Sequence, residues 1–219
     1  MKITKSQLFT FINFFIAVTG ITAAIVAMTY GSRGARLDGT ITAHWQQIFT
    51  FTVLSNIFLS IVAFISAILN IRGKLSGRAA TWYLTAATAG AVTCITVLFF
   101  LAPMRAARGS NYFDMILEPM FFLHFLNPIL AAVSFVFFLP TIPSARHARL
   151  IATIPILAYA VPYILFVVIL QLVPDFYGVT FGGRYYLTPL VFLAFFLLAF
   201  AAASLLLFLH RKALNPKSI

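Results

Sequence analysis

Charged residues are scarce in this sequence, and acidic ones are the scarcest. Only 9% of the 219 residues are Asp, Glu, Lys or Arg, whereas about 25% is usual for a soluble domain. Four acids stand against 15 Lys and Arg, which gives a formal net charge of +11. A water-facing surface on a chain of this length needs many more ionised groups, so the composition excludes a soluble globular domain.

Cysteines and metal ligands are also few. Cys94 is the only cysteine, which excludes an internal disulfide and a CxxC metal or redox pair. The four acids are too few for a two-metal site, and a haem held between helices needs two facing histidines, where only His124 lies deep in an apolar run. HExxH, Walker and GxSxG motifs are missing. We therefore expect neither a metal nor another cofactor.

Long apolar runs dominate what remains. The chain is 62% hydrophobic with a mean hydropathy of +1.02, and its runs are long enough to cross a hydrocarbon layer of about 30 Å. The first is too long for the apolar part of a signal peptide, so we expect it to be a retained span. The sequence predicts an all-α integral membrane bundle, one domain over 1–219, with six transmembrane helices at about 7–30, 46–70, 80–102, 115–139, 149–173 and 185–209.

The basic residues flank these runs unevenly. They sit singly or in small groups at run ends without interleaved aromatics, which favours contact with membrane lipids and argues against nucleic acid. The positive-inside rule then predicts cytoplasmic termini and a multi-pass protein of the cell membrane. Ten basic residues fall on the side of the termini and five on the other: Lys2, Lys5, Arg72, Lys74, Arg78, Arg146, Arg149, Arg211, Lys212 and Lys217 against Arg33, Arg36, Arg105, Arg108 and Arg184.

Two runs carry polar residues at membrane depth. In the second, Thr52, Ser55 and Asn56 share one helix face. In the fourth, His124 lies near the middle, with Asn127 following it. Such groups often hold membrane helices together through hydrogen bonds. They are also expensive to bury in lipid, which makes intramembrane ionisable residues functional candidates.

The depths of these two clusters favour a catalytic interpretation. Both runs go from the outside inwards, and Thr52 and His124 differ in depth by only about 4–5 Å at 1.5 Å per residue. A hydroxyl beside an imidazole is the minimum for a nucleophile activated by a base. Ser55, Asn56 and Asn127 are then candidates for binding substrate or stabilising an oxyanion.

Two further groups bear on this dyad. Glu118 lies about 9 Å higher than His124 and on another helix face, so no carboxylate completes a triad. We expect Glu118 and Asp114 to line the outer entrance or to pair with nearby arginines. Thr50 is a rival nucleophile, although it points about 160° away from Thr52 around the helix.

The same residues resemble a known family. Six spans, with Phe51-Thr52-x-x-Ser55-Asn56 in the second and Leu123-His124-x-x-x-Pro128 in the fourth, are similar to the androgen-induced and androgen-dependent TFPI-regulating membrane hydrolases and their bacterial six-span relatives. The eukaryotic members are threonine hydrolases that cleave fatty acid esters of hydroxy fatty acids. The resemblance implies a Thr52 nucleophile, a His124 partner and a lipid or fatty-ester substrate.

Two other classes of function stay open at this point. A small-molecule or lipid carrier, or a receptor, would use the same polar pocket without covalent chemistry, and a structural partner would use these residues only for packing. A carrier should continue its polar path to the inner side, where Asn13 and Asn70 are the only candidates. The oligomeric state, a homo-oligomer included, is open.

The charge asymmetry makes the first testable prediction, which is topology. In a Cys94→Ala background, Asp38→Cys should react with a membrane-impermeant thiol reagent added outside intact cells, because Asp38 lies in a predicted outer loop. Labelling only after the cytoplasmic side is opened would reverse the orientation.

Overall fold

A computed structural model describes residues 3–30, 44–117, 120–144, 146–172, 175 and 177–214. These residues form helices and connecting loops, and no strand occurs among them. Six helical stretches are long and apolar enough to cross a membrane, namely Lys5–Tyr30, Phe51–Ile71, Gly77–Ala106, Phe121–Phe138, Ala148–Ile169 and Tyr185–Leu214. The prediction of an all-α bundle with six spans is confirmed, and the chain is a multi-pass membrane protein.

Most spans combine several helix types. The α-helices are α1 (Lys5–Tyr30), α3 (Phe51–Ile71), α4 (Gly77–Thr96), α5 (Ala102–Ala106), α6 (Asn127–Val133), α7 (Ala148–Ile151), α8 (Ile154–Tyr163) and α9 (Thr188–Leu214). Turns of π-helix occupy η2 (Val97–Leu101), η4 (Phe121–Leu126), η5 (Ser134–Phe138) and η6 (Ile164–Ile169). Short 3₁₀ helices form η1 (His44–Phe49), η3 (Tyr112–Met115) and η7 (Tyr185–Leu187).

Local side chains determine where α3 and α4 begin. Thr50 and Ser76 are N-caps in extended conformation, and their hydroxyls accept hydrogen bonds from the backbone N–H groups of Val53 and Ala79. A capping side chain satisfies a donor that the helix itself leaves unpaired. Because Thr50 caps α3, that helix begins at Phe51, later than the expected start near 46.

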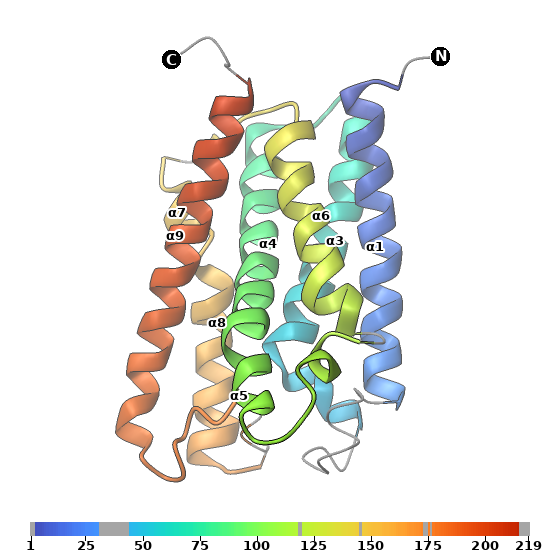
Figure 1. Ribbon diagram of the computed structural model, residues 1–219. Helices are drawn as coiled ribbons and strands as arrows, with labels where there is room; N and C mark the ends of the chain where they lie inside the picture. The colour runs from blue at the N-terminus through green and yellow to red at the C-terminus, as the bar shows by residue number, and fades with distance from the viewer. Residues whose placement is uncertain are drawn as a thin grey trace.

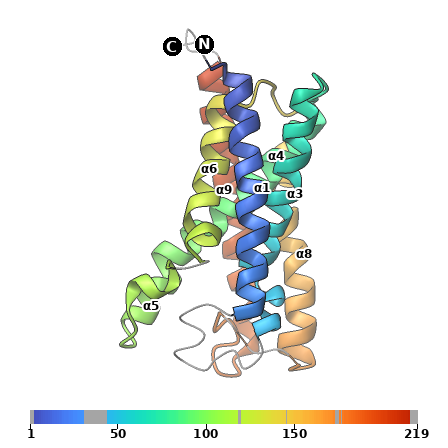
Figure 2. The ribbon, with the colours of Figure 1, turned by 90° about the vertical axis from the view of Figure 1, so that its right-hand side faces the viewer.

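Helix α4 is the centre of the bundle. It packs against α3, α6, α8 and α9, and Figure 1 shows it running between α9 on one side and α6 with α1 on the other. In the most apolar stretch of the span that contains α4, Gly77–Ala106, 67% of residues are buried, against 28% in that of the span that contains α9. Helix α5 continues from α4 but leaves the bundle at an angle (Figure 2). Lipid therefore covers much of α9 and little of α4.

The ends of the spans also alternate as the sequence predicts. Helix α1 starts and α9 ends at the same end of the bundle (Figure 1). Which side of the membrane this end faces stays a prediction. We call it the terminal end, and the opposite end, where α3 begins and α5 lies, the distal end.

Polar side chains near the terminal end serve packing. Asn13 donates to the Phe9 carbonyl at 2.8 Å and to the Ser134 hydroxyl at 2.9 Å. Asn70 donates to Ser6 and to the Thr10 hydroxyl. The two asparagines on which a polar path for a carrier would depend are thus engaged between helices.

Close packing of α1 on α3 leaves little room for a side chain at Gly20. A Cβ atom placed there would lie 2.1 Å from the Ser60 hydroxyl oxygen and 3.2 Å from the Asn127 amide nitrogen. Small residues at such contacts let membrane helices approach closely.

We predict that Gly20→Ala destabilises the bundle by about 1–3 kcal/mol, as overpacking of a dense core usually does. Ser60→Ala in the same protein should recover part of the loss, because it removes the nearest clashing atom. Thermal unfolding in detergent measures both. Equal stability of Gly20→Ala and wild type would contradict this account of the contact.

Candidate functional site

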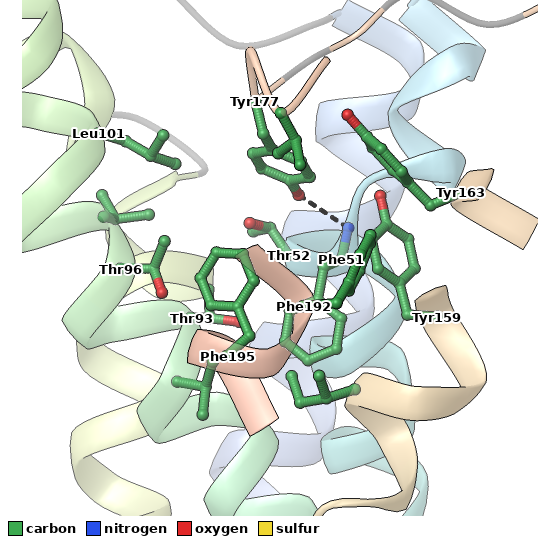
Figure 3. A pocket seen from close by; sticks show the side chains of 14 residues that line it. Phe51, Thr52, Thr93, Thr96, Leu101, Tyr159, Tyr163, Tyr177, Phe192 and Phe195 are labelled. Carbon is green, nitrogen blue, oxygen red and sulfur yellow. Dashed lines mark hydrogen bonds between the residues drawn. The ribbon is translucent and has the colours of Figure 1, made fainter. Parts of the chain in front are cut away.

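A narrow cavity of about 40 Å³ lies near the distal end, among α3, α4, α8, α9 and the loop that precedes α9. Figure 3 shows hydroxyl groups from several of these elements facing it. Its wall is otherwise apolar and aromatic. The lining residues are Phe51, Thr52, Val92, Thr93, Thr96, Val97, Leu101, Ile156, Tyr159, Tyr163, Tyr177, Val179, Phe192 and Phe195.

Thr52 stands on this wall in the first turn of α3. Its side chain is 7% exposed, and its hydroxyl lies beside the phenol of Tyr177 (Figure 3). Unlike Thr85 and Thr93, which donate to carbonyls four residues earlier, Thr52 does not return its hydroxyl to its own helix. The hydroxyl is therefore directed at the cavity.

Thr50 has a different role from Thr52. Its hydroxyl donates to the Gln47 carbonyl at 2.7 Å and accepts from the Val53 N–H at 3.3 Å. Both bonds belong to the cap of α3, and Thr50 is not on the cavity wall.

Ser55 and Asn56 connect α3 to its neighbours. The Ser55 hydroxyl lies 3.0 Å from the Thr93 hydroxyl of α4. The Asn56 amide nitrogen donates to the Thr52 carbonyl at 2.9 Å and to the Leu123 carbonyl at 2.8 Å. These two bonds use both amide hydrogens, so Asn56 fixes the position of Thr52 and has none left for an oxyanion in this arrangement.

His124 lies in the π-helical turn η4 and is 4% exposed. Its Nδ1–H donates to the Met115 carbonyl. A carbonyl only accepts, so the neutral ring keeps its proton on Nδ1 and presents Nε2 as a hydrogen-bond acceptor. The contact of Asn56 with Leu123 places this turn about one helical turn, roughly 5.4 Å, deeper than Thr52.

The structure brings the two segments of the proposed dyad together but does not join their side chains. Among the described residues, no hydrogen bond connects Thr52 with His124, and His124 is not part of the cavity wall. Asn127 faces α1 instead, where its side-chain oxygen accepts from the Thr19 hydroxyl at 2.9 Å. Glu118 lies outside the described residues.

Three tyrosines complete the polar part of the cavity, and no sequence motif predicts them as site residues. Tyr159 donates to the Phe49 carbonyl at 2.7 Å. The phenol oxygen of Tyr177 accepts the Phe51 N–H at 2.8 Å, which pairs the first N–H of α3 (Figure 3). Tyr159 and Tyr163 are four residues apart on one helix face, a spacing that could have indicated a shared role.

Asp175 organises the loop that carries Tyr177. Its carboxylate accepts from the Tyr163 hydroxyl, the backbone N–H groups of Tyr177, Val179 and Thr180, and the Thr180 hydroxyl. Burial raises the pKa of Asp175, but the hydrogen bonds from Thr180 and Tyr163 outweigh it, so the pKa lies below its ordinary value.

The comparisons leave the family undecided. The chain matches no protein-family model, and neither a curated protein nor a solved structure matches it. The fold and the cavity define a multi-pass helical membrane protein with a hydroxyl-lined internal site. The resemblance to the membrane hydrolases stays a prediction.

The pKa of Asp175 makes a testable prediction about pH. A carboxylate with a lowered folded pKa stabilises the protein above its unfolded pKa of about 3.9, and this stabilisation is lost as the pH falls through the lower folded pKa. Asp175→Asn should therefore unfold at a lower temperature than wild type at pH 7, and the two should converge on acidification. A difference that does not change with pH would contradict the role of the charge.

Proposed function

We propose that the protein is an intramembrane hydrolase of the cell membrane that cleaves a lipid or fatty-acid ester, with Thr52 as nucleophile and His124 as its base. The observation that carries the proposal is the Thr52 hydroxyl on the wall of an apolar cavity within the bundle. A nucleophile for lipid chemistry needs this kind of environment, since the substrate stays in the hydrocarbon layer.

The state of His124 supports its assignment as the base. The bond from Nδ1–H to Met115 holds the ring and leaves Nε2 to accept a proton. Turns of π-helix are frequent at functional sites, and η4 is such a turn. Catalytic hydrogen bonds are often long or unformed before substrate binds. We therefore expect the hydrogen bond between Thr52 and His124 to form only in the complex with substrate.

The reaction proceeds by two transfers of the acyl group. Thr52 Oγ1 attacks the ester carbonyl while its proton passes to His124 Nε2, and the tetrahedral intermediate expels the alcohol, which takes that proton. Water then attacks the acyl-threonine and gives one proton to His124. The acid leaves, and His124 returns the proton to Thr52. No oxidant, reductant or further reactant is required.

A second function is non-covalent binding of a lipid or small molecule, as in a carrier or receptor. The observation that favours it is the position of His124 off the cavity wall, without a hydrogen bond to Thr52. The engaged Asn13 and Asn70 count against a continuous polar path through the membrane.

A covalent probe separates the two functions. A fluorophosphonate should label the wild type and Thr52→Ser, whereas Thr52→Val, which keeps the side-chain shape, should lose labelling. His124→Asn retains a donor for the Met115 carbonyl but has no basic nitrogen, so its labelling rate should fall by about 10²- to 10⁴-fold. Mass spectrometry should find the adduct on Thr52.

Thr50→Ser is the matched control, because it keeps the capping hydroxyl of α3 and should keep the labelling rate. The losses of Thr52→Val and His124→Asn should not add up in the double variant, since a dyad acts as one unit. Folded wild-type protein that resists the probe and releases no acid from fatty esters in liposomes would rule out the hydrolase and leave the binding function.

A further inference from the structure

A large groove lies next to the cavity, between the distal part of the α4 span and α9. Its volume is about 530 Å³, within the range of about 300–1,000 Å³ that is usual for small-molecule sites. Residues of η2, α5, α9 and the loop before α9 line it, and most of them are apolar. The cavity beside Thr52 has room for a functional group, whereas this groove has room for a chain.

The groove and the cavity adjoin each other. Five residues belong to the walls of both: Thr96, Leu101, Tyr177, Val179 and Phe195. Phe195 reaches from α9 and Leu101 from η2, so these two side chains stand where groove and cavity meet (Figure 3). The groove and the cavity are therefore neighbours, with the side chains of these shared residues at their boundary.

The groove opens toward lipid. Phe100 and Leu190 form part of its wall and are 61% and 60% exposed, and both belong to stretches long and apolar enough to span the membrane. The hydrocarbon layer therefore supplies the molecules that meet this surface, and an acyl chain matches its chemistry.

Thr96 marks the place where a polar group of the ligand would lie. It is on the wall of both spaces and only 9% exposed, and its hydroxyl has no hydrogen-bond partner among the described residues. In Figure 3 the Thr96 side chain lies between those of Leu101 and Thr93, on the α4 side of the cavity. A buried polar group without a partner is costly, and a carbonyl oxygen of a ligand would accept its hydrogen.

The bundle also has a groove of about 310 Å³ on the opposite side of the cavity, between α3 and α8. It shares only Phe51 and Tyr159 with the cavity wall. Its three hydroxyls are already engaged: Ser55 with Thr93, Thr85 with the Thr81 carbonyl and Tyr159 with the Phe49 carbonyl. None of these hydroxyls lacks a partner, so the observations favour the groove beside α9.

We propose that the groove between η2 and α9 binds one acyl chain that enters sideways from the lipid layer, with its carbonyl oxygen at the Thr96 hydroxyl. The proposal rests on the proposed function at Thr52 and adds the route and the position of the chain. Phe195 and Leu101 lie at the boundary between the acyl chain in the groove and the ester group in the cavity. The size of the groove selects for the length of the chain.

Two alanines allow a matched test. Ala194 lines the groove beside α9, Ala158 lines the opposite groove, and both are exposed. Ala194→Trp should slow labelling by a fluorophosphonate with a long alkyl chain by about tenfold or more, since a blocked apolar pocket discriminates on this scale. Labelling by a short-chain fluorophosphonate should change less than about twofold, and Ala158→Trp should affect neither probe.

Photocrosslinking tests the groove without chemistry at Thr52. A long-chain fatty acid that carries a diazirine should crosslink to η2 and α9 in liposomes, in wild type and in Thr52→Val alike, and Ala194→Trp should abolish this signal. Thr96→Val should weaken binding by about two- to tenfold through the lost hydrogen bond. Thr88→Val is the control, because it removes another α4 hydroxyl that has no hydrogen-bond partner among the described residues and is not on the cavity wall.

The outcomes separate the two proposals. Chain-length selectivity that moves with Ala158→Trp, or crosslinks spread evenly over the lipid-facing helices, would overturn the groove and leave the hydrolase standing. If the wild type reacts with neither fluorophosphonate, the proposal of a hydrolase fails, and crosslinking alone then decides whether the groove binds an acyl chain. Crosslinks in the groove that Ala194→Trp removes then establish acyl-chain binding, and their absence ends both proposals.

Discussion

Asn56 makes the bond on which the geometry of the candidate site depends. Its amide joins the Thr52 carbonyl in α3 to the Leu123 carbonyl in η4. Hydrocarbon offers no water to replace such a bond, so breaking it would leave polar groups unpaired at membrane depth. The bond therefore sets the height of α3 relative to η4 and, with it, the separation in depth between Thr52 and His124.

Polar groups at the two ends of the bundle are used differently. Near the terminal end several are paired between helices: Asn13 donates to Ser134, and His210 lies fully buried between the carbonyls of Val136 and Thr141. At the distal end, the side chains of Thr52 and Thr96 line the cavity. Paired groups give stability, whereas hydroxyls that face a cavity remain for a ligand.

The sequence predictions that the structure confirms rest on the apolar runs and on the helical period. Both are local properties of the sequence, which do not depend on how distant segments pack. The shared face of Thr52, Ser55 and Asn56 follows from their spacing in a helix, and all three are buried toward the bundle. The sequence predicts that the second span starts near 46, whereas α3 begins at Phe51 because Thr50 caps it. Its depth makes Asn127 a catalytic candidate in the sequence, but its side chain faces α1, because depth along a helix does not fix direction around it.

By itself, the sequence determined that the chain crosses a membrane as six helices, since each helix satisfies its own backbone in lipid and needs only a long enough apolar run. Only the tertiary structure decided where the cavity lies. The loop before α9 folds around Asp175 and places Tyr177 over the first N–H of α3, a contact between residues 51 and 177. Contacts over that separation arise from how the helices pack together, and no local pattern of residues encodes them.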